Sequence, residues 1–375
     1  MRAGRIRLAL FGLSALALAA CSSQVPAGSA TMAAELQPLG TAPETTSLSQ
    51  PATAVSAADG PIEFALHDGS FAAKGLTVSV PLSAEAQVKE AVVTGDAPLD
   101  NLAGSDALDL YAQGYPIQAI GCTSANVGFY VFARKGVTAH RLAGTTVGVP
   151  SLDGAPQFAM DDFAARHGVN PARVTFTPLG SIPNVLAALE AGRIDVGLLS
   201  TPFNLRAKAD GLTSLGFAIG PPSPYVVNTG WAAKNGATIT SWIEAFVQGT
   251  WAYYTDKKAA EAVLASFLGL NPAGPKDAAT LSASFKNYLP PVSEPLGECS
   301  AANFAPYLRF FPAQEQARLR NLGRFIDNRY VTQLARSGFY ARQQARYGPV
   351  PGLTLQQVIA SQPPLAGTGR RAARS

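Results

Sequence analysis

Residues 185–202 constrain the fold more than any other stretch, because they combine a helix, a glycine stop, a strand and the start of a second helix. The apolar side chains of the first helix share one face: Val185, Leu186 and Leu189. Ser181 can cap this helix, and Gly192 can end it in the left-handed conformation that only glycine adopts without strain. Residues 194–199 then predict a short buried strand, and Thr201-Pro202 predicts a new helix, as its cap and first residue. A strand that runs directly into a helix places free N–H groups at the ligand-binding edge of an open α/β sheet.

A weaker copy of this unit precedes it in the chain. Val88 and Gly95 have the same spacing as Val185 and Gly192, and residues 96–102 correspond to the strand that follows. Two like units favour two lobes of one architecture whose ligand-binding edges face each other. Because helix–glycine–strand units are common in α/β proteins, an ordinary α/β sheet without a cleft is the alternative.

The first twenty residues have the organisation of an export signal. A basic start precedes an apolar run, residues 8–20, which is too short to span a bilayer as a stable helix. The run ends in Leu-Ala-Ala-Cys at residues 18–21, which resembles the lipoprotein signal of bacteria. The resemblance implies that residues 1–20 are removed and that Cys21 carries acyl chains, of which more than one gives stable anchoring. The alternative is an ordinary secretory signal, with the cysteine there by chance.

Composition limits the classes of function. A hydrophobic content of 47% with 14% charged residues is typical of a globular protein, and the net charge is only +4. No basic stripe with interleaved aromatic residues occurs, so we expect no nucleic-acid partner. The three histidines, His67, His140 and His167, lie on separate segments without metal-ligand spacing, and no nucleophile elbow or phosphate-binding loop occurs. We therefore expect no enzyme, no cofactor and no metal.

Five short motifs follow one another between residues 59 and 235: Ala-Leu-His-Asp-Gly-Ser-Phe-Ala-Ala-Lys-Gly-Leu-Thr-Val at 65–78, residues 95–101, Gly-Tyr-Pro-Ile-Gln-Ala-Ile at 114–120, Leu-Ala-Gly-Thr-Thr-Val-Gly-Val at 142–149, and residues 189–202. In this order they resemble the motifs of nitrate-, sulfonate- and taurine-type solute-binding proteins of ABC importers, which are related to thiamine-pyrimidine-binding proteins. Pro98-Leu99 is inserted relative to this pattern, and Thr145 stands where a lysine is usual. The resemblance implies a type II periplasmic-binding-protein fold of α/β class, with two lobes, each a mostly parallel sheet flanked by helices, and a ligand cleft between them.

The order of expected elements agrees with that fold, because strands and helices alternate. We expect residues 228–234 to be the strand that returns the chain to the first lobe, and residues 242–346 to be mainly helical. The Ser-, Thr-, Ala- and Pro-rich segment after the signal is typical of a tether, with room for a first strand near residues 35–41. The expected organisation is therefore: signal peptide 1–20, tether 21–58, first part of lobe 1 at 59–136, lobe 2 at 137–227, completion of lobe 1 with C-terminal helices at 228–350, and tail 351–375.

Candidate ligand-binding residues stand at strand ends, at helix starts and near the return crossing: Asn101, Ser105, Thr123, Ser124, Asn126, Ser151, Gly154, Ala155, Gln157, Thr201, Tyr225 and Trp231. Gly154 permits close backbone approach, while Ser151 and Gln157 can donate to an anion or a carbonyl. The two aromatic residues can stack on a planar ligand, or they can belong to the core. Each polar residue has the alternative role of an ordinary turn or cap. Asp195 is expected to be structural, and Arg193 and Arg206 to face solvent.

Cysteine usage adds one expectation. If Cys21 carries lipid, Cys122 and Cys299 remain as a pair in an oxidising compartment, and we expect a disulfide between them. The alternative is two buried free thiols.

These features predict a monomeric substrate-binding protein, exported and lipid-anchored to the cell envelope, either in the periplasm or on the outer face of the cytoplasmic membrane. It would capture a small solute, a sulfonate- or nitrate-like anion or a small heterocycle, and deliver it to an ABC permease. An enzyme of the same fold, in pyrimidine or menaquinone-precursor synthesis, and a ligand-sensing surface lipoprotein are the alternatives.

Overall fold

The computed structural model describes residues 36–53, 55–124, 128–287 and 296–349, all within one compact unit, Ala33–Ser375. Cys21, Asn126 and the expected tail, 351–375, lie outside the described residues. None of the helices in the described ranges is both long enough and apolar enough to cross a bilayer.

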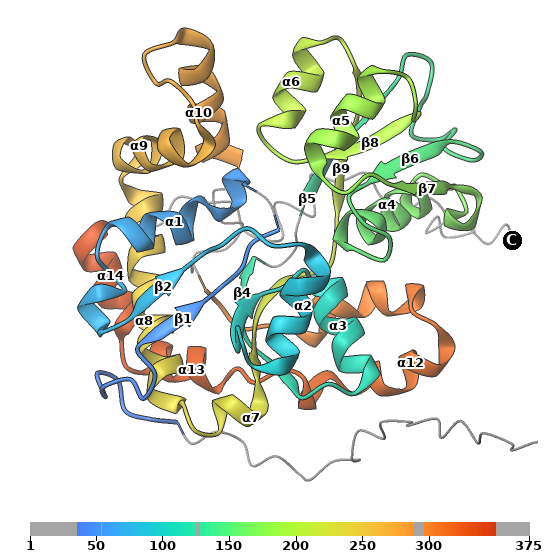
Figure 1. Ribbon diagram of the computed structural model, residues 1–375. Coiled ribbons are helices and arrows are strands. Elements are labelled where there is room, and N and C mark those ends of the chain that lie inside the picture. Colours follow the sequence, from blue (N-terminus) through green and yellow to red (C-terminus); the bar gives the residue numbers. More distant parts are fainter. Residues whose placement is uncertain (1–35, 54, 125–127, 288–295, 350–375) are drawn as a thin grey trace, which may run out of the picture. The chain divides into compact units, whose positions relative to one another are not determined.

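Strands and helices alternate through the first part of lobe 1 (Figure 1): β1 (Ser47–Ser49), α1 (Gly60–His67), β2 (Thr77–Ser79), α2 (Glu85–Thr94), β3 (Leu99–Asn101), α3 (Gly104–Gln113) and β4 (Ile117–Ser124). β1 and β2 are parallel, and the Gln50 side chain donates to the Leu99 carbonyl oxygen, which ties β1 to β3. The first strand is therefore β1 and not the segment near residues 35–41, where the sequence suggested it. Residues 36–41 contain a turn that the Thr41 N–H closes on the Pro38 carbonyl.

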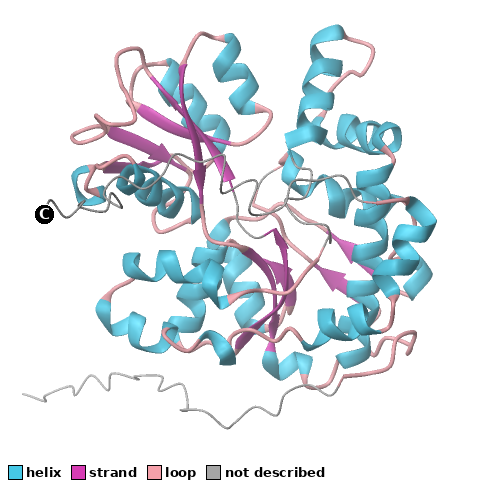
Figure 2. Cartoon of the chain, turned by 180° about the vertical axis from the view of Figure 1, so that it is seen from behind, coloured by secondary structure: helices cyan, strands magenta, loops and turns pink. Residues whose placement is uncertain are grey.

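Lobe 2 is a five-stranded sheet of order β7-β6-β8-β5-β9 with helices between its strands. Its elements are β5 (Gly128–Ala133), β6 (Thr146–Val149), α4 (Ala155–Arg166), β7 (Thr175–Pro178), α5 (Ile182–Glu190), β8 (Val196–Leu199), α6 (Phe203–Ala209) and β9 (Thr213–Ile219). β6 is parallel to β7 and β8, whereas β5 is antiparallel to both of its neighbours. Figure 2 shows the strands of the two lobes in separate groups with helices around each.

The return strand to lobe 1 is β10 (Ser223–Asn228), which lies between β3 and β4 and is antiparallel to both. This strand ends where the expected return strand, 228–234, was to begin. The Asn228 side chain accepts hydrogen bonds from the N–H groups of Gly230 and Trp231, and this cap starts a short helix, α7 (Thr229–Ala232), in place of further strand. The described strands of lobe 1 therefore form a parallel pair, β1-β2, and a sheet of order β3-β10-β4 in which both pairings are antiparallel.

Helices complete lobe 1: α8 (Gly236–Thr255), α9 (Lys257–Leu268), α10 (Pro275–Asn287), α11 (Ala301–Phe304), α12 (Ala313–Leu319), α13 (Arg329–Arg336) and α14 (Phe339–Tyr347). α8 is the longest of them and buries Trp242 fully against the strands, beside Phe246 and Tyr225. The C-terminal segments also cover the free edge of β4, through the bridges Cys122–Gly297 and Ala119–Ile326. Covering this edge protects it from pairing with another chain.

Both helix–glycine–strand units are present. Ser181 accepts the N–H of Asn184 at the start of α5, and Gly192 and Gly95 have φ values of 70° and 91°. One detail of the prediction is wrong, since Pro202 and not Thr201 is the N-cap of α6. The Pro202 carbonyl accepts the N–H groups of Leu205 and Arg206, so the helix starts one residue later than expected.

Candidate functional site

Strands of both lobes lead into helices at their carboxyl ends. In lobe 1, β1, β2 and β3 precede α1, α2 and α3, and in lobe 2, β6, β7 and β8 precede α4, α5 and α6 (Figure 1). We call these two sets of strand ends and helix starts the carboxyl edges. A carboxyl edge is the usual ligand-binding edge of an open α/β sheet, because the first N–H groups of each helix point toward it.

The two carboxyl edges touch each other. The Ser151 hydroxyl, in the loop after β6 of lobe 2, donates to the Glu85 carboxylate at the start of α2 in lobe 1, with an O–O distance of 2.7 Å. The Lys89 ammonium lies 3.8 Å from Glu85 and 3.6 Å from Asp106, which is in the first turn of α3. A predicted ligand-binding residue of lobe 2 therefore contacts the start of α2 in lobe 1, and Lys89 links that contact to the start of α3.

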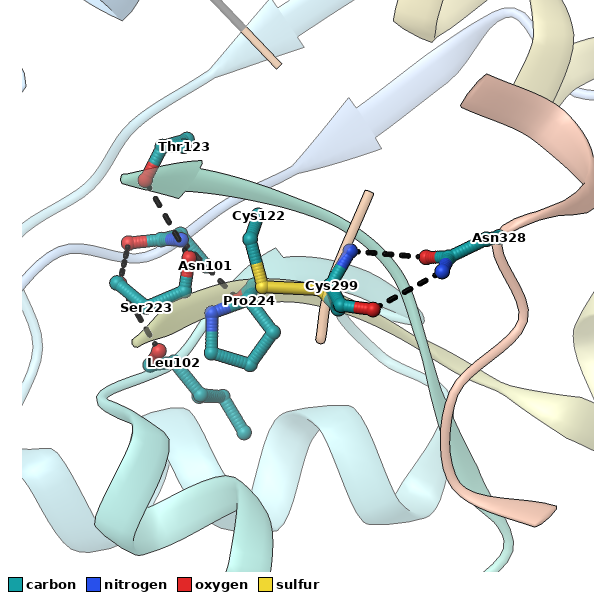
Figure 3. The surroundings of a disulfide bond; sticks show 8 residues. All are labelled: Asn101, Leu102, Cys122, Thr123, Ser223, Pro224, Cys299 and Asn328. Atoms are coloured by element: carbon teal, nitrogen blue, oxygen red, sulfur yellow. Dashed lines mark hydrogen bonds between the residues drawn. A yellow bond between two sulfur atoms is a disulfide. The ribbon is translucent and has the colours of Figure 1, made fainter. Parts of the chain in front are cut away.

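The chain passes between the lobes twice, after β4 and after β9, and the two passages start and end side by side. Gly128 pairs with Ile219 in the lobe 2 sheet, and Ser124 pairs with Ser223 in the lobe 1 sheet. The Thr123 hydroxyl donates to the Ser223 carbonyl at 3.3 Å (Figure 3). Two adjacent crossings are the geometry that a hinge between two lobes requires.

In lobe 1 the structure brings Asn101, Thr123 and the end of β4 at Ser124 together around Ser223 (Figure 3). The Ser223 hydroxyl donates to the Asn101 side-chain oxygen at 2.9 Å, and the Asn101 amide donates to the Pro224 carbonyl at 3.1 Å. These polar groups hold the start of the return strand. Ser105, in the first turn of α3, is fully buried, and its hydroxyl has no hydrogen-bond partner in the described part of the chain.

In lobe 2 the start of α4 brings together Ser151, Gly154, Ala155 and Gln157. A Cβ atom on Gly154 would lie 2.7 Å from the Ser151 hydroxyl, so this glycine lets the loop fold closely on itself. The Gln157 side-chain oxygen accepts the N–H of Asp153 at 3.0 Å and thereby holds the same turn. Thr201 is fully buried in the connection between β8 and α6.

The two aromatic residues that were expected to stack on a ligand or to belong to the core pack within lobe 1. Tyr225 is only 4% exposed, and its ring packs 4.4 Å from the Trp242 ring in the core of lobe 1. Trp231 belongs to α7, beyond Asn228, which pairs with the first residue of β4 and so marks the end of the sheet opposite the carboxyl edge. The structure therefore places both aromatic side chains in packing positions.

Cys122 and Cys299 form a disulfide in the structure, with a Cα–Cα distance of 5.1 Å (Figure 3). The bond ties β4, next to the first crossing, to the segment before α11. Asn328 holds the Cys299 backbone from both sides, by accepting its N–H and donating to its carbonyl, each at 2.9 Å.

Buried carboxyl groups at the carboxyl edge of lobe 1 are the feature that the sequence interpretation missed. Asp100, next to the end of β3, is 3% exposed, and burial and the Asp59 carboxyl raise its pKa well above the usual value. Burial, reinforced by Glu63, raises the pKa of Asp59 to about 7. Burial and the nearby Glu85 carboxyl likewise raise the pKa of Asp106 to about 7. A signal was present, since all three aspartates stand at strand ends or helix starts.

A similar group lies in lobe 2. Asp161 of α4 is 9% exposed, and burial and the Asp153 carboxyl raise its pKa to about 7. Its neighbour Asp162 instead pairs with Arg166 of the same helix and with Arg309 of the C-terminal region.

Other charged residues behave as expected from the sequence. Asp195 accepts the N–H of Thr146 at 2.9 Å and pairs with Arg134, and these contacts lower its pKa. Arg206 is exposed and pairs with Glu190 and Asp210. Among the described residues, no group of three or more His, Cys, Asp or Glu side chains could hold a metal ion.

Solved structures share the fold of this chain. The alkanesulfonate-binding protein SsuA from Xanthomonas axonopodis pv. citri, bound to MOPS, matches with a TM-score of 0.60 and 17% identity, over 76% of this chain and 98% of its own. The periplasmic nitrate-binding protein NrtA from Synechocystis matches with a TM-score of 0.61 and 12% identity, over 84% and 93% of the two chains. This chain has the periplasmic-binding-protein fold.

The aliphatic sulphonate-binding protein SsuA from Escherichia coli has the same periplasmic-binding-protein fold, with a TM-score of 0.57 and 17% identity, over 76% of this chain and 91% of its own. These are the kinds of protein that the sequence motifs resemble, so the resemblance is confirmed at the level of the fold. No family model and no curated protein matches the sequence.

Proposed function

We propose that this chain is the substrate-binding protein of an ABC-type importer, exported and anchored to the cell envelope through lipid on Cys21. The observation that carries the proposal is the pairing of two facing carboxyl edges, joined by the Ser151–Glu85 hydrogen bond, with two adjacent crossings. This is the geometry of a receptor that closes on a solute. Residues 44–50 pack into lobe 1 through β1, Glu44 and Gln50, so the tether expected at 21–58 is shorter than that range. Its sequence before residue 36 would let the receptor, as a monomer, reach a permease.

Capture needs no chemical step. A solute that contacts both carboxyl edges stabilises the closed form by its difference in affinity for the closed and open forms. Helix N-termini and the polar side chains around Ser105 and Ser151 would supply contacts from the two lobes. The permease would then distinguish the loaded, closed receptor from the empty one.

An enzyme with this fold is the second candidate, and the environments of the histidines count against it. The Nδ1 atoms of His67 and His167 lie 2.7 Å and 2.8 Å from backbone carbonyl oxygens of their own helices. The fold does bring His140 and His167 together, with ring centroids 5.3 Å apart, although they are distant in sequence. Even so, the His140 Nδ1 lies 3.0 Å from the His167 carbonyl oxygen, so each of the two rings has a nitrogen at hydrogen-bond distance from a backbone carbonyl.

A thermal-shift screen of the full-length chain in detergent tests the proposed function. The panel contains nitrate, taurine, alkanesulfonates, aromatic carboxylates, pyrimidines and aliphatic amines. A true solute at about a thousand times its Kd stabilises the fold by about 4 kcal/mol, which raises Tm by several degrees. The same screen is run on the Ser151→Ala variant, which lacks the hydrogen bond between the carboxyl edges. The rise in Tm with a true solute should be smaller for this variant than for the wild type. A panel without any response would contradict the proposed function.

A further inference from the structure

Three buried polar atoms at the carboxyl edges have no hydrogen-bond partner in the described part of the chain. They are Oδ2 of Asp100, Oγ of Ser105 and Oδ1 of Asn204, and the side chains are 3%, 0% and 5% exposed. Asp100 and Ser105 belong to lobe 1, whereas Asn204 is in the first turn of α6 in lobe 2. All three atoms can accept hydrogen bonds, and buried acceptors are normally paired. A solute that donates hydrogen bonds would supply the missing partners.

Charge at the carboxyl edges points the same way. The edge segments are 50–60, 80–89, 100–106, 150–158, 178–184 and 200–206. Their sequences contain five acidic residues, Asp59, Glu85, Asp100, Asp106 and Asp153, and two basic residues, Lys89 and Arg206. Lys89 pairs with Glu85 and Asp106, and Arg206 pairs with Glu190 and Asp210. The basic groups of these segments are therefore already occupied by carboxylates. Above about pH 7, where Asp59 and Asp106 ionise, an anionic solute would also meet an excess of negative charge.

The edge segments also present apolar surface. The large hydrophobic side chains that are exposed in the described part of the chain are Val55, Leu82 and Leu152, at 39%, 63% and 50%. Val55 and Leu82 follow β1 and β2 of lobe 1, and Leu152 follows β6 of lobe 2. Ligand sites typically combine such apolar lining with a few placed polar groups.

We infer that the solute is an organic cation, a protonated amine, amidine or guanidine on a small apolar body, which donates to Asp100 and neighbouring acceptors at the carboxyl edges. This inference rests on the proposed function and narrows it. It separates this chain from the sulfonate- and nitrate-binding proteins of the same fold, whose named solutes are anions.

The pH dependence of binding distinguishes a cation from an anion. The titratable and charged groups around Asp100 and Asp106 are Asp59, which precedes α1, Glu63 of α1, Glu85 and Lys89 of α2, Asp109 of α3 and Tyr225 of β10, with Tyr254 of α8 next to Tyr225. Because the pKa values of Asp59 and Asp106 are raised to about 7, these carboxyl groups ionise as the pH rises through neutrality. Affinity for a cation should then increase with pH, and affinity for an anion should decrease.

The test uses pairs of probes with the same shape and opposite charge: benzamidine with benzoate, and n-butylamine with n-butyrate. Thermal shift and calorimetry of the full-length chain in detergent are run at about pH 5.5 and about pH 8.5, on either side of the raised pKa values. We expect the cationic member of a pair to bind, more tightly at the higher pH. Asp100→Asn should weaken that binding about tenfold to hundredfold, because an amide cannot take up the negative charge that a bound cation favours on the Asp100 carboxyl group. The matched control is Asp96→Asn, an exposed carboxylate in the bend between α2 and β3.

The outcomes separate the inference from the proposed function. Binding of benzoate or n-butyrate, or of nitrate or an alkanesulfonate, without binding of either cation would overturn the inference and leave a solute receptor. Cation binding that is equal at both pH values, or that Asp96→Asn weakens as much as Asp100→Asn, would also overturn it. A chain that binds neither charge class at either pH contradicts both the inference and the proposed function.

Discussion

Gly104 shows how one residue determines the contact between a helix and the second crossing. It is the first residue of α3, and a Cβ atom at this position would overlap the Pro222 carbonyl oxygen. The start of α3 therefore packs directly on the backbone that connects β9 to β10. Neither partner can move easily, because both are backbone.

We predict that Gly104→Ala destabilises the fold by about 1–3 kcal/mol, as overpacking of a close contact does. The measurement is the free energy of unfolding in denaturant. Gly274→Ala is the control, since a Cβ there meets its nearest neighbour at 3.5 Å, an ordinary contact. Equal stability of the two variants would show that α3 does not press on the crossing.

At the scale of elements, the C-terminal segments act as extra edge pairing for β4. Backbone hydrogen bonds join Ala119 to Phe325 and Asp327, and join Cys122 to Gly297. The Cys122–Cys299 bond adds a covalent link at this edge, between residues that are 177 positions apart in the chain. A cross-link over so long a loop strongly restricts the unfolded chain.

Replacing both Cys122 and Cys299 by Ala should lower the free energy of unfolding by about 2–5 kcal/mol. Thermal melts with and without reductant check this. Reductant should lower the Tm of the wild type and leave that of the double variant unchanged. A wild type that is insensitive to reductant, and has two thiols that react with an alkylating agent, would contradict the disulfide.

At the scale of the whole molecule, the buried carboxyl groups couple stability to pH. The pKa values of Asp106 and Asp161 are raised from 3.8 to about 7, so between these values the folded state holds protons that the unfolded state has released. The free energy of unfolding therefore falls as the pH rises through this window. We expect the solute-free chain to be more stable at about pH 5 than at about pH 8, as measured by denaturant unfolding.

Asp161→Asn should remove part of this dependence. At about pH 8 the variant should be more stable than the wild type by on the order of 2 kcal/mol, because the wild type must bury a charge there. At about pH 2.8, a unit below the pKa of 3.8 in the unfolded state, the two proteins should have the same stability, since the carboxyl group is then largely protonated in both states. A difference that is constant across the pH range would show that the effect is one of packing and not of charge.

Much of the fold could be predicted from local signals. The glycines at 95 and 192 end helices because their positive φ values suit residues without a Cβ, and Ser181 caps, through its own hydroxyl, the helix that Gly192 ends. Such effects need only neighbouring residues. The end of the return strand was missed because it depends on the Asn228 side chain turning back to cap α7, against the strand propensity of the surrounding residues.

The sequence by itself determined the alternation of strands and helices, the two like units and the choice of Cys122 and Cys299 as partners, because each follows from periodicity, local capping or simple counting. Only the tertiary structure decided which side chains share the carboxyl edges. The ring of Tyr225 lies in the core because it packs against Trp242 of α8. Asp100 is buried near Asp59. Burial and contacts between distant segments set the charge and the partners of a carboxyl group, and the order of residues along the chain does not contain them.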